Sequence, residues 1–243
     1  MALEAEFLSS LQHPHIIKIR GTSISGPGGF AQGPKGYFLI IDTLTDTLGA
    51  RIKKWKKRRG GGLVSSIKIA APIRSVLNKE ETKSERKESP ITEEQLNVAL
   101  QISAALVYLH GKNVIFRDLK PDNVGFDVRG DVKIFDFGLA CVMPSNGDPY
   151  EDKFEMSGAG SPRYMAPEVL VDEPYYNLKA DVYTYGIVLW QMLSLQVPFL
   201  EIKKKDELID YVGEYYLRHC NFSDSSDHHF SDIIFLFVWC ALE

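Results

Sequence analysis

One stretch, residues 113–138, constrains the fold of this chain more than any other part of the sequence: NVIFRDLKPDNVGFDVRGDVKIFDFG. Short apolar runs alternate in it with Asp, Asn, Gly and Pro, a pattern that favours short strands joined by a polar loop and a tight turn. We predict strands at 113–116, 123–126 and 132–135, a loop at 117–122 and a turn at 127–131. Polar side chains at the ends of these strands should therefore lie near one another.

Four of these polar residues offer a matched set of chemical groups. Asp118 can accept a proton from a hydroxyl, and Lys120 can bring a positive charge to a phosphate. Asn123 and Asp136 supply oxygen ligands of the kind that Mg²⁺ prefers. Phosphoryl transfer depends mainly on positioning and on charge stabilisation, so this set is what the reaction requires.

The stretch resembles the eukaryotic protein kinase superfamily. The signatures R-D-L-x-x-x-N, D-F-G and A-P-E occur in the family's order as Arg117-Asp118-Leu119 with Asn123, Asp136-Phe137-Gly138 and Ala166-Pro167-Glu168. A lone D-F-G arises by chance, but the order and gaps favour the family over a coincidence of polar turns. The resemblance implies an α+β, bilobal kinase-like fold with a truncated small β lobe and a mainly helical large lobe.

The resemblance also implies a domain organisation. Residues 1–44 would be the remnant of the small lobe, residues 45–218 the large lobe, and residues 219–243 a tail that does not match. The chain would begin inside the regulatory helix, whose Glu4 normally pairs with a lysine that grips ATP. Neither that lysine nor the glycine-rich loop is found in the expected place, so the chain is expected to be incomplete at both ends.

The small-lobe remnant is predicted to contain one helix and two strands. Apolar residues recur at helical spacing from Leu3 to Leu11, and strands are expected at 16–20 and 37–41. By the family pattern Ile41 is the gatekeeper beside the nucleotide. The backbone of Asp42 and Leu44, in the hinge that follows, would face the adenine.

A basic run, RIKKWKKRR, occupies residues 51–59. We favour a solvated helix tip leading into a disordered insert that covers about residues 51–90, because Gly60–Gly62 and the mixed charges of 79–88 lack apolar periodicity. A nuclear signal and a docking patch for an anionic partner are the alternatives.

A long helix should follow the insert. Thr92 and Gln95 have the spacing of a capping box, and Gly111 is placed to end the helix. The apolar residues expected to be buried are Leu96, Leu100, Ala104 and Val107.

The resemblance assigns roles to individual residues. Asp118 would be the base or orienting group, and Lys120 beside it is typical of Ser/Thr-directed kinases; Asn123 and Asp136 would hold Mg²⁺. Phe116 replaces the usual histidine of the catalytic loop. We expect it to lose a hydrogen bond to the backbone but to keep the packing beneath Phe137.

Regulation is expected in the loop that follows. Arg117 would bind a phosphate, and Ser157 is the leading phosphorylation site. The alternative, an unmodified serine in this loop, has equal weight. Ser161 stands where Ser/Thr kinases commonly have threonine. Glu168 lacks the arginine that normally pairs with it, because no arginine or lysine follows Arg218.

The composition excludes few classes of protein. The net charge of −4 gives no overall bias towards nucleic acid or anionic membrane, and no apolar run reaches membrane-spanning length. Three widely spaced cysteines and the absence of a signal-peptide pattern favour a cytoplasmic protein. The basic run 51–59 makes a nuclear location the alternative. The oligomeric state stays open.

Two functions compete. The first is an ATP- and Mg²⁺-dependent protein serine/threonine kinase domain acting on protein hydroxyls, nearest to the tyrosine-kinase-like branch. The second is a pseudokinase-like scaffold that acts by binding proteins. Because the phosphate-gripping lysine is missing, this chain by itself is expected to be weakly active or inactive.

Overall fold

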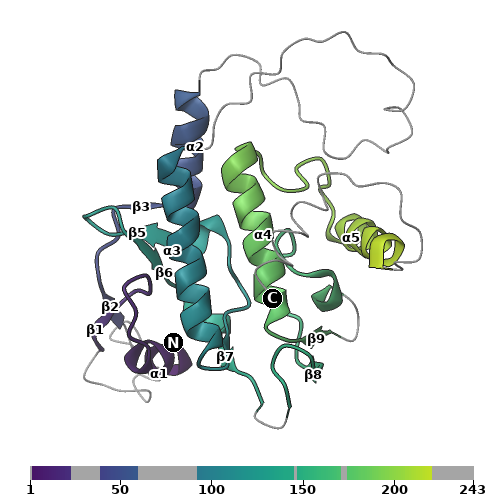
Figure 1. Ribbon diagram of the computed structural model, residues 1–243, viewed down its shortest axis with the longest axis horizontal. Helices are drawn as coiled ribbons and strands as arrows, with labels where there is room; N and C mark the ends of the chain where they lie inside the picture. The colour runs from purple at the N-terminus through teal and green to yellow at the C-terminus, as the bar shows by residue number, and fades with distance from the viewer. Residues whose placement is uncertain (1, 23–38, 60–91, 145–146, 171–173, 221–243) are drawn as a thin grey trace, which may run out of the picture.

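The computed structural model describes residues 2–22, 39–59, 92–144, 147–170 and 174–220, and it has the mixed helices and strands of an α+β fold (Figure 1). The predicted insert from residue 60, the tail from residue 221 and the loop 23–38 lie outside the described residues. Within the described part, no helix is both long and apolar enough to cross a bilayer.

The first elements confirm the predicted helix and strands. Helix α1 (Ala2–Ser10) buries Leu8 against the core. Strand β1 (Ile19–Thr22) pairs antiparallel with β2 (Leu39–Ile41). Strand β1 begins later than predicted because Ile16 instead forms a parallel bridge with Ile134.

The stretch 113–138 forms the predicted succession of strands. Strands β4 (Val114–Ile115), β5 (Val124–Phe126) and β6 (Val132–Ile134) are all fully buried. Strand β5 pairs antiparallel with β6 and with β3 (Asp46–Thr47), and β4 pairs with β7 (Cys141–Val142).

The tight turn between β5 and β6 is held by one carboxylate. Oδ1 of Asp127 accepts hydrogen bonds from the amides of Arg129 and Asp131, at 2.9 and 3.0 Å. Gly130 has a φ of 89°, a conformation that glycine adopts without steric cost.

Helix α2 (Leu48–Arg58) corrects the predicted start of disorder at residue 51. The hydroxyl of Thr47 caps it, and Leu48, Ile52 and Trp55 are buried. Apolar residues spaced by three or four along the basic run therefore anchor it as a helix, while most of its cations face outward.

Helix α3 (Glu93–His110) begins with the predicted capping box of Thr92 and Gln95 and ends at Gly111. The predicted buried face is wrong: Leu96, Leu100 and Val107 are exposed by 55%, 59% and 71%. The buried positions belong to the opposite side of the helix and are Gln95, Val98, Ala99, Ile102, Ala105, Leu106, Leu109 and His110.

Helix α4 (Lys179–Ser194) packs beside α3 (Figure 1). Helix α5 (Lys205–Cys220) lies beyond it and contacts the 3₁₀ turn η5 (Pro167–Val169). The remaining short elements connect these layers; they are the turns η3 (Pro121–Asn123) and η4 (Phe137–Leu139) and the paired strands β8 (Phe154–Glu155) and β9 (Tyr175–Tyr176).

Candidate active site

Asp118 lies at the centre of the polar cluster between β4 and β5. It is 8% exposed. Its Oδ2 accepts hydrogen bonds from Nζ of Lys120 at 2.6 Å and from Nδ2 of Asn123 at 2.9 Å, and Nδ2 of Asn123 also donates to the Asp118 carbonyl. The predicted proximity of these three residues is confirmed. Their hydrogen bonds fix the orientation of the carboxylate.

Ser161 brings a second loop to the same carboxylate. Its hydroxyl donates to Oδ1 of Asp118 at 2.9 Å and accepts from Nζ of Lys120 at 3.0 Å. The loop can approach this closely because Gly160 precedes Ser161. Gly160 has a φ of 127°, and a Cβ atom there would lie 2.7 Å from the Arg117 carbonyl oxygen.

Asp136 reaches the cluster through the backbone. It follows β6, and the amide of the preceding Phe135 donates to the Asn123 carbonyl at 3.1 Å. Its own backbone is left-handed, with a φ of 64°. Its side chain is exposed and has no hydrogen bond or ion pair among the described residues. The structure therefore brings Asp118, Lys120, Asn123 and Ser161 into direct contact and leaves Asp136 beside them without a side-chain contact.

The oxygen atoms suit a divalent cation. Both amide hydrogens of Asn123 are used on Asp118, so its Oδ1 atom is the one left for a ligand. Asp136 adds a carboxylate that has no ion pair within the described part of the chain. No group of three or more His, Cys, Asp or Glu residues within the described part could hold a metal. Mg²⁺ sites typically have one or two protein oxygens as ligands, and water and phosphate oxygens complete the coordination shell.

Phe116 keeps the packing predicted for it. Its ring meets Phe137 edge to face, with 5.0 Å between the centroids, and both side chains are buried. They belong to the same apolar cluster as Leu8 of α1 and the partly buried Ile19 of β1. The aspartate of the D-F-G segment is thus tied through its neighbouring phenylalanine to the N-terminal helix.

Asp181 in the first turn of α4 anchors the catalytic loop from beneath. It is 1% exposed. Its carboxylate accepts from the amides of Phe116 and Arg117 at 2.8 and 2.9 Å and interacts with Nε2 of His110 at 3.0 Å. The other ring nitrogen of His110 lies 3.1 Å from the hydroxyl of Tyr150. Every oxygen of this buried acid is therefore hydrogen-bonded.

Arg117 points away from Asp118, towards the segment before Ser161. Its guanidinium lies 4.4 Å above the ring of Tyr176 and donates through Nη2 to the backbone carbonyl of Ser157. Nε is buried and has no hydrogen-bond partner among the described residues. Burial raises the pKa of the neighbouring Cys141 thiol, although the charge of Arg117 opposes the shift.

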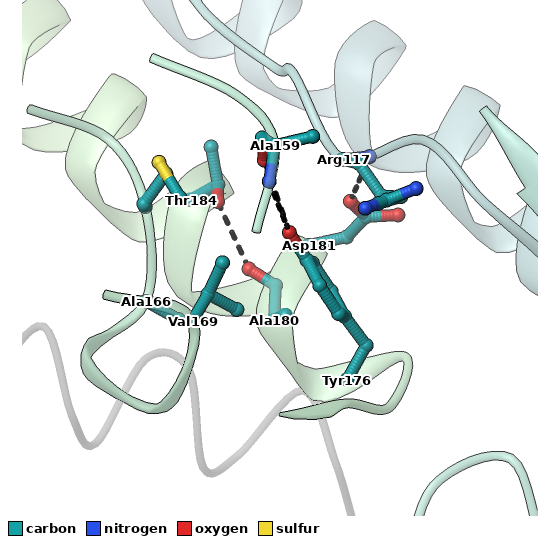
Figure 2. A pocket seen from close by; sticks show the side chains of 9 residues that line it. Arg117, Ala159, Ala166, Val169, Tyr176, Ala180, Asp181 and Thr184 are labelled. Atoms are coloured by element: carbon teal, nitrogen blue, oxygen red, sulfur yellow. Dashed lines mark hydrogen bonds between the residues drawn. The ribbon is translucent and has the colours of Figure 1, made fainter. Parts of the chain in front are cut away.

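A small pocket lies next to this arginine. Figure 2 shows that Arg117 of the catalytic loop, Tyr176 of β9 and Asp181 of α4 line it, and the hydroxyl of Tyr176 is hydrogen-bonded to Ala159. The full lining is Arg117, Ala159, Met165, Ala166, Val169, Tyr176, Ala180, Asp181 and Thr184. The predicted phosphate-binding arginine therefore contacts the backbone of Ser157, whose side chain is exposed.

Within the described residues, the predicted hinge residues form no hydrogen bond or ion pair with the Asp118 cluster. Ile41 is 39% exposed at the end of β2. The amide of Asp42 donates to the Lys18 carbonyl at 3.1 Å, and its carboxylate forms an ion pair with Arg20. The Leu44 side chain packs so closely on β5 that a Cβ atom at Gly125 would lie 2.6 Å from it.

Glu4 and Glu168 are the two remaining acids that the sequence predicts to be regulatory. Glu4 is part of α1, but its side chain lies outside the described residues. Glu168 forms no ion pair within the described residues, and burial raises the pKa of its carboxyl.

Sequence reasoning did not assign the anchoring residues around the loop. Asp181 carried a usable signal, because it is the lone acid in a mainly apolar helix and a buried acid needs hydrogen-bond donors. The His110–Asp181 pair and the Tyr176 ring beneath Arg117 join residues far apart in the chain, and nothing local marks them.

Comparisons with known proteins agree with this geometry. A family model described as protein kinase domain matches residues 64–239, a range that includes most of the tail expected not to match. The cAMP-dependent protein kinase type 3 of Saccharomyces cerevisiae is 30% identical over 196 residues, which is 81% of this chain and 37% of that protein.

Two Raf kinases are also similar. The Raf homolog serine/threonine-protein kinase of Caenorhabditis elegans is 38% identical over 129 residues, 51% of this chain and 15% of that protein. The serine/threonine-protein kinase A-Raf of Mus musculus is 39% identical over 126 residues, 50% of this chain and 20% of that protein. The chain spans at most 37% of the length of these three relatives. It belongs to the protein kinase domain family, on the serine/threonine kinase side.

Proposed function

We propose that this chain supplies the catalytic half of a protein serine/threonine kinase that transfers the γ-phosphoryl group of ATP to protein hydroxyls. The observation that carries the proposal is the convergence of Lys120, Asn123 and Ser161 on the Asp118 carboxylate. Burying a carboxylate with three donors from two loops costs free energy, because every one of these polar groups must be desolvated. We therefore take the arrangement as a sign of function.

Each residue then has a defined task. Asp118 orients the substrate hydroxyl and receives its proton, and Lys120 places a positive charge next to the transferring group. Oδ1 of Asn123 and the carboxylate of Asp136 would hold Mg²⁺. When bound, Mg²⁺–ATP supplies the phosphoryl group and offsets its negative charge.

The hinge has a smaller part in the proposal. Because the Asp42 amide is already bonded to Lys18, only the Asp42 carbonyl is left for the adenine. The backbone of Leu44 and the side chain of Ile41 would complete that edge. The tight packing of Leu44 on Gly125 supports a fixed position for this segment.

The test is a transfer assay with Mg²⁺–ATP and protein substrates on a form that also carries a glycine-rich loop and its lysine. Asp118→Asn should abolish phosphate transfer, and Asp210→Asn on the exposed side of α5 should leave it unchanged. Unaltered transfer in the Asp118→Asn variant would refute the role of Asp118.

The 243-residue chain alone is expected to transfer phosphate very weakly or not at all. Measurable turnover by this chain would contradict that part of the proposal. A scaffold without turnover remains the competing function, and it predicts that the longer form is inactive as well, with or without Asp118.

The position of the Arg117 guanidinium beside the Ser157 backbone supports regulation by phosphorylation. A phosphate on the exposed Ser157 would replace a neutral carbonyl with a charge-assisted partner for the guanidinium. Mass spectrometry of protein from its native cells detects a phosphate on Ser157, and the transfer assay compares the parent protein with an Arg117→Ala variant. Activity that is independent of both the Ser157 phosphate and Arg117 would contradict the proposal.

We also propose that the protein acts in the cytoplasm on protein substrates, without nucleic acid or membrane as a partner. The two cations at the ends of the run 51–59 are engaged within the fold: Arg51 lies 3.4 Å above the Phe126 ring, and Arg59 bonds Gln95 and the Leu193 carbonyl. This engagement supports a structural role for them over a nuclear signal. Imaging of a fluorescent fusion protein with and without substitutions at Lys56 and Lys57 would separate the two locations.

A further inference from the structure

Tyr150 links the loop between the D-F-G and A-P-E segments to the support of the catalytic loop. Its hydroxyl lies 3.1 Å from Nδ1 of His110, and the two rings meet edge to face with 5.8 Å between their centroids. Nε2 of the same histidine lies 3.0 Å from Oδ2 of Asp181. The three side chains thus form one network that ends at the amides of Phe116 and Arg117.

The partners of His110 determine which of its ring nitrogens carries the proton. Oδ2 of Asp181 already accepts from the amide of Phe116, and a carboxylate offers only acceptors, so Nε2 must donate to it. In the neutral imidazole, Nδ1 then presents a lone pair. The hydroxyl of Tyr150 must therefore donate to Nδ1. Burial and the charge of Asp181 raise the pKa of Tyr150, which keeps this proton on the phenol.

A closed turn at residues 148–152 carries Tyr150. Oδ1 of Asp148 accepts from the amides of Tyr150 and Glu151 at 2.8 and 3.3 Å. In the opposite direction, the amide of Asp148 donates to Oδ2 of Asp152 at 2.7 Å, and the amide of Asp152 donates to the Asp148 carbonyl at 3.0 Å. Aspartate side chains that bond the backbone in this way stabilise turns. The position of Tyr150 within the turn is therefore fixed.

The same turn is fastened to the start of α4. The amide of Leu178 donates to the Pro149 carbonyl at 2.8 Å, and Nζ of Lys179 pairs with Glu151 at 2.9 Å. The ion pair is partly exposed and contributes little by itself. The Tyr150 side chain packs against a buried apolar cluster to which Leu178 also belongs. The turn is therefore bound to the helix that also carries the acid beneath the catalytic loop.

We propose that Tyr150 is a positioning residue for the catalytic loop, because its hydroxyl orients the His110 ring and His110 in turn orients Asp181. The inference rests on the proposed function, since the amide of Arg117 that Asp181 holds lies directly before Asp118. Without the hydroxyl, Nδ1 loses its donor and the ring is free to change its tautomer or its orientation. The docking of turn 148–152 on α4 is thereby coupled to the geometry of the active site.

A spectroscopic test uses the 243-residue chain and requires no phosphate transfer. Long-range ¹H–¹⁵N spectra of the His110 ring should show one protonated and one unprotonated nitrogen in the parent protein. In Tyr150→Phe these two signals should move towards each other, because both tautomers become populated. The amides of Phe116 and Arg117 should also exchange hydrogen at least about threefold faster.

Tyr175→Phe is the matched control for Tyr150→Phe. It makes the same chemical change in β9, but the Tyr175 hydroxyl forms no hydrogen bond within the described residues, and the ring lies 4.4 Å from Nζ of Lys153. The His110 spectrum and the two amide exchange rates should be those of the parent protein.

A kinetic test uses the longer form with the glycine-rich loop and its lysine. Tyr150→Phe should lower kcat by about three- to tenfold and leave the KM values for ATP and protein substrate unchanged, because the residue lies outside the Asp118 cluster. His110→Gln keeps a donor for Asp181 but has no ring nitrogen to accept from Tyr150. Adding Tyr150→Phe to that variant should therefore lower kcat no further.

The two tests distinguish the role of Tyr150 from kinase activity. Identical His110 spectra and amide exchange in Tyr150→Phe and the parent protein would overturn the proposal, whether or not the longer form transfers phosphate. So would an equal effect of Tyr175→Phe, or a loss of kcat that persists in full in the His110→Gln background. An inactive longer form together with changed His110 spectra and faster amide exchange would refute the kinase function and still support the control of the loop by Tyr150.

Discussion

At the scale of single residues, Glu168 makes the sharpest prediction about pH. Burial raises the pKa of its carboxyl, and no cation among the described residues offsets the shift. The folded protein thus binds this proton more tightly than the unfolded chain. The stabilisation is fully present below the ordinary pKa of 4.5 and is lost as the pH rises through the raised value.

Glu168→Gln should therefore raise the free energy of unfolding by about 1 kcal/mol at pH 7 and change it little near pH 4. Urea unfolding at both pH values measures the difference, and Glu201→Gln at an exposed position provides the control. A destabilised Glu168→Gln protein at pH 7 would indicate that the carboxylate has a stabilising partner.

Residue chemistry explains which parts of the candidate site the sequence could predict. Asp118, Lys120 and Asn123 are close in the chain, so a short polar loop between two buried strands suffices to bring them together. Arg117 is different: its partners Tyr176 and Ser157 come from distant segments, so only the resemblance to kinases pointed to its role. That the Ser157 carbonyl, and not its hydroxyl, meets Arg117 could not be predicted.

At the scale of elements, α4 is the support on which the catalytic loop is held. Asp181→Asn would turn an NH₂ group towards the donors of His110, Phe116 or Arg117, leaving at least one buried donor unpaired. We expect a loss of about 2–4 kcal/mol in the free energy of unfolding. The amides of Phe116 and Arg117 should also exchange hydrogen faster.

Chemical denaturation and amide exchange measure the two effects of Asp181→Asn. Tyr150→Phe removes only the outermost bond of the same network, at His110, and should cost about 1 kcal/mol. If Asp181→Asn exchanged like the parent protein at these two amides, the support would come from elsewhere.

Helix α3 shows where periodicity fails at this scale. Its start, its end and its capping box follow from the sequence, but its buried face does not. Apolar residues occur nearly all around the helix, so Leu96 and Leu100 fit a buried stripe as well as Val98 and Ile102 do. The side that packs is set by α4 and the strands, and these contacts join segments that are remote in sequence.

At the scale of the whole molecule, the N-terminal elements and the active-site cluster are joined through a single apolar core. That core extends from Leu8 of α1 through Phe116 and Phe137 to Val188 of α4. A ligand bound beside Asp136 would therefore stabilise all of these elements together, because binding to the folded state alone shifts the unfolding equilibrium.

This linkage separates cation binding from catalysis. Saturation with Mg²⁺–ATP to about a hundredfold above its dissociation constant should stabilise the chain by roughly 2.7 kcal/mol, which calorimetry would register as a higher melting temperature. Asp136→Ala should remove the magnesium-dependent part of the increase, since it deletes a cation ligand. Asp118→Asn should keep most of it, because Asp118 serves the hydroxyl and not the metal. Equal loss in both variants would mean that the two acids act as one site, and the division of roles between them would have to be abandoned.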